Sequence, residues 1–276
     1  MPKAAKPVAD VAAHDRPLDE PQKNYHTVLQ QQIVQAEEEL RRPAPALLLS
    51  GLTAGLDIGF GPFAMAVVLT LTRGAISPAL QQLLLPNFYA VGFLFVVLGR
   101  SALFTEHTAS AIQPVLDGRA SIVSLLRLWG LVLAANIVGA TIMTWFSVRM
   151  GLALHIVDAD AFRALADRMT APSSGIIFCS AIGAGWLMGL LSWLTVAARD
   201  TTAQFLIVWM TTFIIGLAGL HHSIAGTVEV LGGFFAHTGT TLPDYLHFLI
   251  LAVLGNAVGG TVFVAALKYS HIKAVS

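Results

Sequence analysis

Two short runs of polar residues interrupt otherwise apolar stretches of the chain, and their side chains are the ones that could act on a solute. The first run is Thr-Glu-His at 105–107, and the second is His-His-Ser at 221–223. Ionisable groups inside an apolar segment are costly and are candidates for function by default. Among them His222 is the strongest candidate, because a neutral imidazole donates a hydrogen bond to a solute, while a protonated one attracts an anion or passes it a proton.

Each of these candidates also has a purely structural interpretation. A core histidine that is hydrogen-bonded to backbone is the alternative for His222 and for His221. Packing, or a charge at the membrane interface, is the alternative for Glu106, His107 and Glu229. We therefore carry both interpretations of each residue forward to the structure.

The spacing of these residues does not favour an enzyme or a metal site. No His-Glu-x-x-His pattern places zinc ligands on one helix face. The one cysteine, Cys179, excludes an internal disulfide and a cysteine-based zinc site, and we interpret it as a small buried hydrophobic residue at the start of a span. Asp57 is another ionisable residue in an apolar segment, which faces either a pore or a subunit contact. We expect no enzymatic activity, no metal and no cofactor.

The composition indicates that most of the protein surface lies in lipid. Of the 276 residues, 55% are hydrophobic and 12% are charged, whereas soluble domains carry about 25% charged residues. So few charges cannot form the polar shell of a soluble protein of this size. The formal net charge is zero and no long basic run occurs, so nucleic acid is not an expected partner.

Six apolar segments are each long enough to cross a hydrocarbon core of about 30 Å. They form a predicted six-span domain over 43–270, with segments near 45–72, 87–116, 121–150, 174–198, 203–234 and 245–268.

The residues that precede this domain are polar. The composition of 1–24 predicts a disordered tail, and helically spaced apolar residues predict an amphipathic helix over 25–42, on the membrane surface or against a neighbouring subunit. Residues 1–43 lack the apolar core of a signal peptide, and Lys and Arg are more frequent on the side of the N-terminus. We therefore expect both termini in the cytoplasm.

Three short patterns recur in the same order along the chain, which indicates an internal repeat. Each copy contains three spans, about 45–150 and 174–270, so the second copy must enter the membrane in the opposite orientation. The prediction is an all-α integral membrane protein with six transmembrane helices in an inverted three-plus-three repeat. The matched runs are 50–59 with 180–189, 136–141 with 256–261, and 103–105 with 220–222, the last of which pairs Thr105 with His222.

Spans two and five are too long for one straight crossing, and each has a polar cluster near its middle. Irregular backbone at membrane depth survives only where it is buried in protein or lines a water-filled cavity. The N-terminus of a half-helix after such a break presents free N–H groups, which suit an anion. We therefore expect both spans to be interrupted, with Thr105 and His222 facing each other across one pore.

These runs resemble the formate/nitrite transporter family. The matching motifs occur in the family's order over about 30–270. The more specific ones are His-Ser-x-Ala at 222–225 and Gly-Asn-x-Val-Gly-Gly at 255–260. The resemblance implies an aquaporin-like protomer, a homopentamer, and one pore per protomer for small monovalent anions such as formate or nitrite. It also implies that His222 lies at the pore midpoint, beside His221 and Ser223, and bonds to Thr105.

The same resemblance implies two apolar constrictions, which exclude hydrated ions, so that a weak acid crosses most easily in its neutral form. Possible accessory residues are Asp57, Glu106, Glu229 and Arg168. The residues at the constrictions are Tyr89, Phe93 and Ile215 on the outer side, and Leu103, Phe104 and Met188 on the inner side.

Four positions depart from the family pattern close to the pore histidine. His221 stands where typical members have Glu, and Gly226 and Gly185 stand where they have Asn. The lysine of their outer vestibule falls at Met169, next to Arg168. These changes alter the hydrogen bonding around His222.

The sequence therefore predicts a multi-pass protein of the cell (inner) membrane that transports small monovalent anions or their weak acids, with His222 as a protonatable centre. The expected partners are a small anion, the lipid bilayer and further copies of the chain in a homopentamer. The alternative is a neutral small-solute channel of aquaporin-like architecture, although the paired Asn-Pro-Ala motifs of aquaporins are absent.

Overall fold

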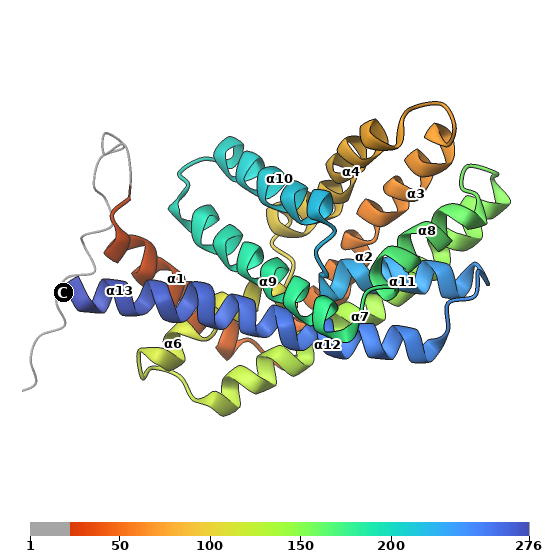
Figure 1. Cartoon of the computed structure of the whole chain (residues 1–276). Helices are drawn as coiled ribbons and strands as arrows, with labels where there is room; N and C mark the ends of the chain where they lie inside the picture. The colour runs from red at the N-terminus through yellow and green to blue at the C-terminus, as the bar shows by residue number, and fades with distance from the viewer. Residues whose placement is uncertain (1–22, 276) are drawn as a thin grey trace, which may run out of the picture.

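Helices are the regular secondary structure of the computed structural model, which describes residues 23–275 (Figure 1). Apart from Lys23 and Asn24, the tail predicted over 1–24 lies outside these residues. The helices are α1 (Tyr25–Arg41), α2 (Ala44–Ile58), α3 (Phe60–Thr72), α4 (Pro78–Leu98), α5 (Phe104–Ser110), α6 (Gln113–Leu116), α7 (Ile122–Ala153), α8 (Ala159–Thr170), α9 (Ser174–Ala197), α10 (Thr201–Ala218), α11 (Ser223–Phe235), α12 (Leu242–Gly260), a π-helical turn at Thr261–Ala266, and α13 (Leu267–Val275).

Six helical stretches within the described residues are long and apolar enough to cross a membrane. Two of them combine neighbouring helices, because α2 continues into α3 and α12 continues into α13. The six are Ala44–Thr72, Pro78–Leu98, Ile122–Ala153, Ser174–Ala197, Thr201–Ala218 and Leu242–His271.

The second of these stretches begins earlier than the predicted start at residue 87, which was wrong. Ser77 caps the helix by accepting the N–H of Leu80, and Pro78 occupies the first turn, where its missing N–H costs nothing. Pro86 lies inside the helix without ending it. The prediction for Cys179 was also wrong, since this side chain is exposed on the surface of α9.

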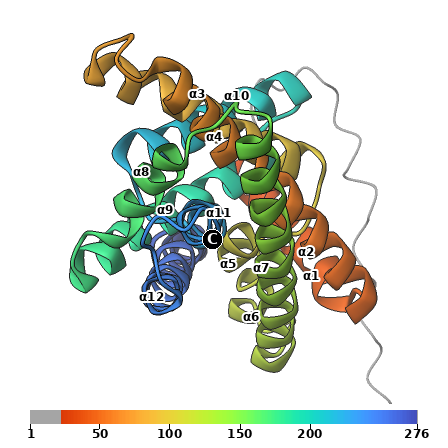
Figure 2. The same cartoon turned by 90° about the vertical axis from the view of Figure 1, so that its right-hand side faces the viewer.

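Non-helical backbone follows both α4 and α10. Residues 99–103 separate α4 from α5, and residues 219–222 separate α10 from α11. Gly219 ends α10 with a φ of 64°, a left-handed conformation that glycine adopts without the penalty other residues meet. In Figure 2, α5 and α11 lie together in the middle of the molecule, surrounded by the longer helices.

One asparagine holds the backbone after α4 in place. The side-chain amide of Asn136, on α7, donates to the carbonyl oxygens of Gly51 and Ala102 at 2.8 and 2.9 Å, and its oxygen accepts the N–H of Phe104 at 2.9 Å. A serine adds to this support, because Ser50 accepts the N–H of Ala102 at 2.9 Å.

A second asparagine repeats this arrangement after α10. Asn256, on α12, donates to the carbonyl oxygens of Ala181 and His221 at 2.8 and 2.9 Å and accepts the N–H of Ser223 at 2.8 Å. Ser180 likewise accepts the N–H of His221 at 3.1 Å. Every bond of the first set therefore has a counterpart in the second.

These matched bonds correct one detail of the sequence alignment. They pair Ala102 with His221 and Phe104 with Ser223, so the counterpart of His222 is Leu103. Thr105 lies two residues further along and is not the equivalent of His222. The short sequence match had no feature that could fix the register.

Glycines allow the helices that carry the asparagines to approach their neighbours. α2 packs on α7, and α9 packs on α12. A Cβ atom on Gly55 would clash with the backbone oxygen of Asn136, and one on Gly185 would clash with that of Asn256. The amphipathic helix α1 packs on the same chain through Val28, Leu29 and Ile33, so this face is covered without a membrane or a second subunit.

Candidate pore site

Thr105 and His222 meet at the centre of the described part of the molecule. Thr105 lies in the first turn of α5, and His222 is the N-cap of α11. The Thr105 hydroxyl oxygen lies 2.8 Å from Nε2 of His222, and the two residues are 0% and 1% exposed. The structure therefore brings the two strongest candidates together although they are not repeat equivalents.

The hydrogen bonds of His222 define its tautomer. Its Nδ1 accepts the backbone N–H groups of Ile224 and Ala225, both at 3.2 Å, so Nδ1 carries no hydrogen. A neutral imidazole then carries its hydrogen on Nε2 and donates it to the Thr105 oxygen. Protonation of Nδ1 would place its N–H against the N–H groups of Ile224 and Ala225. This repulsion between donors disfavours the charged ring. This bonding does not support the expectation of a protonatable centre at His222.

The start of α11 is not the free anion site that the sequence suggested. Ile224 and Ala225 donate to the His222 ring, Ser223 donates to Asn256, and Gly226 donates to the His222 carbonyl. These N–H groups instead polarise the imidazole and strengthen Nε2–H as a donor. Within residues 23–275, the hydroxyl hydrogen of Thr105 has no acceptor, so it can bond to a solute.

Aromatic and aliphatic side chains cover one side of His222. The ring of Phe93 meets the imidazole edge-on at 4.9 Å, and Tyr89 lies 5.1 Å from Phe93 between ring centroids. Ile215 is buried in the same apolar cluster. These residues share one buried apolar cluster, and their role as an outer constriction stays a prediction.

The residues predicted for the inner constriction do not all lie together. Leu103, the N-cap of α5, and Met188 are buried in the same apolar cluster as Phe93. Phe104 belongs to a different cluster and packs edge-on against Trp129 of α7, at 6.1 Å between ring centroids. Phe104 therefore points toward α7, away from the cluster that contains Phe93.

His221 turns away from the Thr105–His222 pair. Its Nε2 lies 3.2 Å from the carbonyl oxygen of Met169, and its Nδ1 lies 2.8 Å from the hydroxyl of Ser180. Since a carbonyl only accepts, Nε2 donates to Met169; in the neutral ring Nδ1 then accepts from the Ser180 hydroxyl. Ser180 is a site residue that the sequence analysis missed, although it opens one of the repeated runs.

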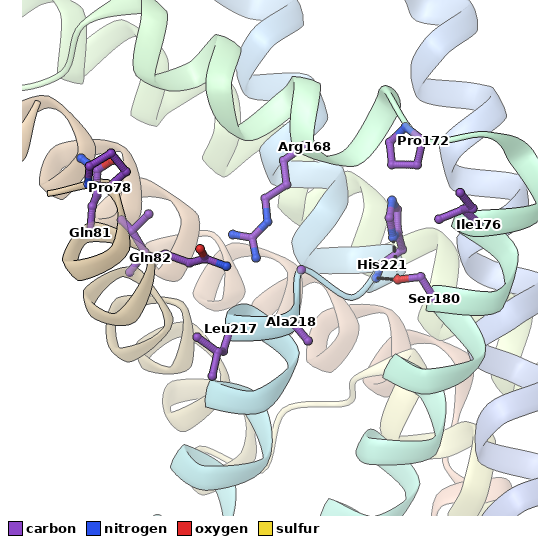
Figure 3. A pocket seen from close by; sticks show the side chains of 12 residues that line it. Pro78, Gln81, Gln82, Arg168, Pro172, Ile176, Ser180, Leu217, Ala218 and His221 are labelled. Carbon is purple, nitrogen blue, oxygen red and sulfur yellow. Dashed lines mark hydrogen bonds between the residues drawn. The ribbon is translucent and has the colours of Figure 1, made fainter.

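An open cavity of about 490 Å³, the entrance cavity, lies where α4, α8, α9 and α10 meet (Figure 3). Arg168 and His221 are its ionisable residues. Figure 3 shows the guanidinium of Arg168 reaching from α8 toward Gln82 and the end of α10. There it donates to the carbonyl oxygen of Gly216. The lining residues are Pro78, Gln81, Gln82, Leu85, Arg168, Pro172, Ile176, Ser180, Leu217, Ala218, Gly219 and His221.

A second, small cavity of about 10 Å³ lies next to the entrance cavity, and Arg168 and Gly219 line both. Its volume is close to the space that one water molecule needs. Tyr89, Ile215 and Glu229 also line it. The two cavities thus share Arg168, and the small one reaches Tyr89.

The predicted accessory residues Asp57 and Glu106, and the further candidate His107, lie elsewhere. Asp57 is half-buried on α2, and Glu106 is half-buried on α5. His107 donates to the carbonyl oxygen of Leu103 at 2.8 Å, and its Nε2 lies 3.8 Å from Glu39 of α1. These residues do not line either cavity. Within the described residues no three His, Cys, Asp or Glu side chains are grouped as metal ligands would be.

Partial burial raises the pKa of the Glu39 carboxyl, but the nearby His107 ring and the hydrogen-bonded Arg42 guanidinium lower it by more. The pKa of Glu39 therefore lies below its usual value. Arg42 bonds to Glu39 at 2.9 Å, so the end of α1 is tied to α5 through one carboxylate.

A family model described as formate/nitrite transporter matches residues 26–270. The chain belongs to this family. One relative is the inner membrane protein YfdC of Escherichia coli, which is 32% identical over 242 residues, or 86% of this chain and 75% of YfdC. A probable formate transporter of Methanothermobacter thermautotrophicus is 30% identical over 258 residues, or 86% of this chain and 93% of that protein.

The fold of this formate/nitrite transporter family member is also that of a solved structure. A pentameric formate channel with formate bound superposes with a TM-score of 0.67 at 24% identity, and the match covers 84% of this chain and 98% of the channel. At this level of identity the similarity shows the shared fold. The resemblance recognised from the sequence is thereby confirmed.

The departures from the family pattern have structural explanations in this member. A side chain on Gly185 would clash with the Asn256 backbone, and one on Gly226 would clash with the ring of Phe248. Met169 is buried and offers only its carbonyl oxygen to His221. Neighbouring helices thus occupy the space that asparagine side chains would need at positions 185 and 226. Arg168 is the cation at the entrance cavity.

Proposed function

We propose that this chain is a membrane channel or transporter for small monovalent anions or their weak acids, with a pore that runs past Thr105 and His222. The observation that carries the proposal is the buried hydrogen bond between these two side chains. It joins α5 to α11, the two short helices that lie in the middle of the molecule. Membership of the formate/nitrite transporter family supports this class of function over a neutral-solute channel.

In this proposal a solute enters through the entrance cavity, passes Tyr89 and Phe93, and reaches Thr105. A bare ion would lose its hydration at the apolar residues, at a cost of several kcal/mol or more. The neutral acid avoids most of this cost. The hydroxyl of Thr105, supported by Nε2–H of His222, then donates a hydrogen bond to the solute as it leaves the aromatic side chains.

The proposal extends to assembly and topology. The chain forms a homopentamer within the lipid bilayer, as the pentameric formate channel of the same fold supports. It lies in the cell (inner) membrane, as its relative YfdC supports by name, with both termini in the cytoplasm and the entrance cavity outside. The duplicated bonds of Asn136 and Asn256 support an inverted repeat whose halves meet at the pore.

Solute flux into proteoliposomes tests the proposed function. The panel is formate, nitrite, acetate and hydrosulfide, with osmotic swelling in glycerol as the neutral-solute arm. Wild-type protein should carry at least one of the anions above protein-free vesicles, and His222→Ala should lower that flux. If no anion is carried, or if glycerol alone passes, the proposed function is wrong.

A further inference from the structure

Glu229 is a buried carboxyl group on the same helix as His222. It lies seven residues after His222, which is the N-cap of α11, and Glu229 is 4% exposed. Within residues 23–275 its carboxyl oxygens make no hydrogen bond and no ion pair. A buried carboxylate without a partner is strongly disfavoured, so this group is suited to hold a proton.

The surroundings of Glu229 contain one cation and one further hydroxyl. Arg168 of α8 and Tyr89 of α4 line the small cavity together with Glu229. Tyr245 of α12 lies 3.4 Å from the hydroxyl of Thr227 and does not line this cavity. The other ionisable side chains of α7, α8 and α12 do not line it either. Glu229 and Arg168 therefore line one space that is large enough for about one water molecule.

Arg168 can draw an anion toward Glu229. It lines both cavities, and its bond to Gly216 leaves other donors of the guanidinium free. The left-handed Gly219 gives it room, because a Cβ at that position would lie 2.8 Å from Nε of Arg168. An anion attracted by Arg168 would thus stop beside Glu229.

Beyond this point the path is apolar, and a proton must be supplied before it. Tyr89 lines the small cavity and contacts Phe93, and Phe93 contacts His222. The ring of Phe93 offers no hydrogen bond to a charged solute. His222 cannot supply the proton, because its Nδ1 accepts two backbone N–H groups and its Nε2–H is bonded to Thr105.

We propose that Glu229 is the proton donor to the transported anion at the outer mouth of the pore, an inference that rests on the proposed function. The O–H bond of the Glu229 carboxyl breaks as an O–H bond forms on the anion, and no electron is transferred. The neutral acid moves past Phe93. The Glu229 carboxylate that remains is stabilised by Arg168 until a hydronium ion from the outer solution protonates it again.

The test compares variants of the full chain in proteoliposomes that contain a pH-sensitive dye. Formate added outside at pH 6 should acidify the interior of wild-type vesicles, because each formate enters with a proton. Glu229→Gln keeps the shape of the side chain and should lower this rate at least about tenfold, as the loss of a positioned proton donor does. Glu229→Asp keeps the carboxyl and should recover most of the rate.

Asp167→Asn is the matched control, because Asp167 is exposed beside Arg168 and lines neither cavity. It should behave as wild type. A Gln variant with less than a tenfold loss, or an Asp variant as slow as Gln, overturns the role of Glu229. Absence of acidification by wild-type protein instead contradicts the proposed function.

Labelling of the wild-type protein keeps the proposal testable if Glu229→Gln fails to assemble. Dicyclohexylcarbodiimide adds to protonated carboxyl groups in apolar surroundings. Peptide mass spectrometry should find the adduct on Glu229, and the labelled fraction should rise in proportion to the loss of transport. Excess formate should slow the labelling. An inhibited protein without an adduct on Glu229, or labelled Glu229 with full transport, overturns the proposal.

Discussion

Replacing Thr105 by valine removes one hydroxyl from the pore and changes little else. Valine has nearly the shape of threonine, and Thr105 is fully buried, so the packing of α5 should persist. The variant leaves Nε2–H of His222 without its acceptor at 2.8 Å, and an unsatisfied buried donor costs about 1–3 kcal/mol. We therefore expect a lower thermal unfolding midpoint for the purified protein.

The same substitution should slow transport. The solute loses the Thr105 hydroxyl as a hydrogen-bond donor, and one net hydrogen bond is worth about 1 kcal/mol, so formate uptake should fall about five- to tenfold. Thr105→Ser keeps the hydroxyl and serves as the control, with uptake close to wild type. Valine and serine variants that both transport at the wild-type rate would refute the role given to this hydroxyl.

Three further substitutions probe the framework around the pore. Asn256→Ala removes three buried hydrogen bonds at once, so it should destabilise the protein by about 3 kcal/mol and reduce the yield of assembled protein in size-exclusion chromatography. Gly185→Ala places a methyl group against the Asn256 backbone and should cost about 1–3 kcal/mol, whereas Gly175→Ala on the same helix meets nothing within 4 Å and should not destabilise. The folded-state pKa of Glu39 is lowered from 4.5, so its stabilising contribution is present above that pH and is lost as the pH falls through the lowered value. The hydrogen-exchange protection factors of 25–41, which are corrected for the intrinsic pH dependence of exchange, should therefore fall on acidification below about pH 4.5 and stay constant in Glu39→Gln.

Each of these three predictions has a result that would contradict it. A stable, fully assembled Asn256→Ala protein would mean that the backbone after α10 is held by other contacts. Equal stability of the two alanine variants on α9 would contradict the close approach of α9 to α12. Protection factors of 25–41 that do not change on acidification would contradict the role of Glu39 in the attachment of α1.

The architecture was largely predictable because lipid imposes simple rules on a sequence. Length and hydropathy gave the six spans, and polar residues at membrane depth marked where the backbone leaves the helix, near 99–103 and 219–222. The start of α4 was misplaced because Gln81 and Gln82 reduce local hydropathy, while Ser77 and Pro78 still form a good helix start.

The details of the site depended on contacts that a sequence does not contain. The register of the repeat is carried by the bonds of Asn136 and Asn256 to backbone, which no short match reveals. The neutral state of His222 follows from two N–H groups that its own helix directs at Nδ1. Glu229 and Arg168 line the same small cavity because α8 packs on α11. The sequence could identify both residues but not their proximity.

The central claim is that the solute passes a neutral His222, bonded through Nε2–H to Thr105. Solid-state ¹⁵N NMR of the histidine-labelled protein in lipid, with His222→Asn to assign the signal, measures this directly. We predict one protonated and one unprotonated ring nitrogen, unchanged between about pH 5 and pH 8. A spectrum in which both nitrogens of His222 become protonated within that range would contradict the claim.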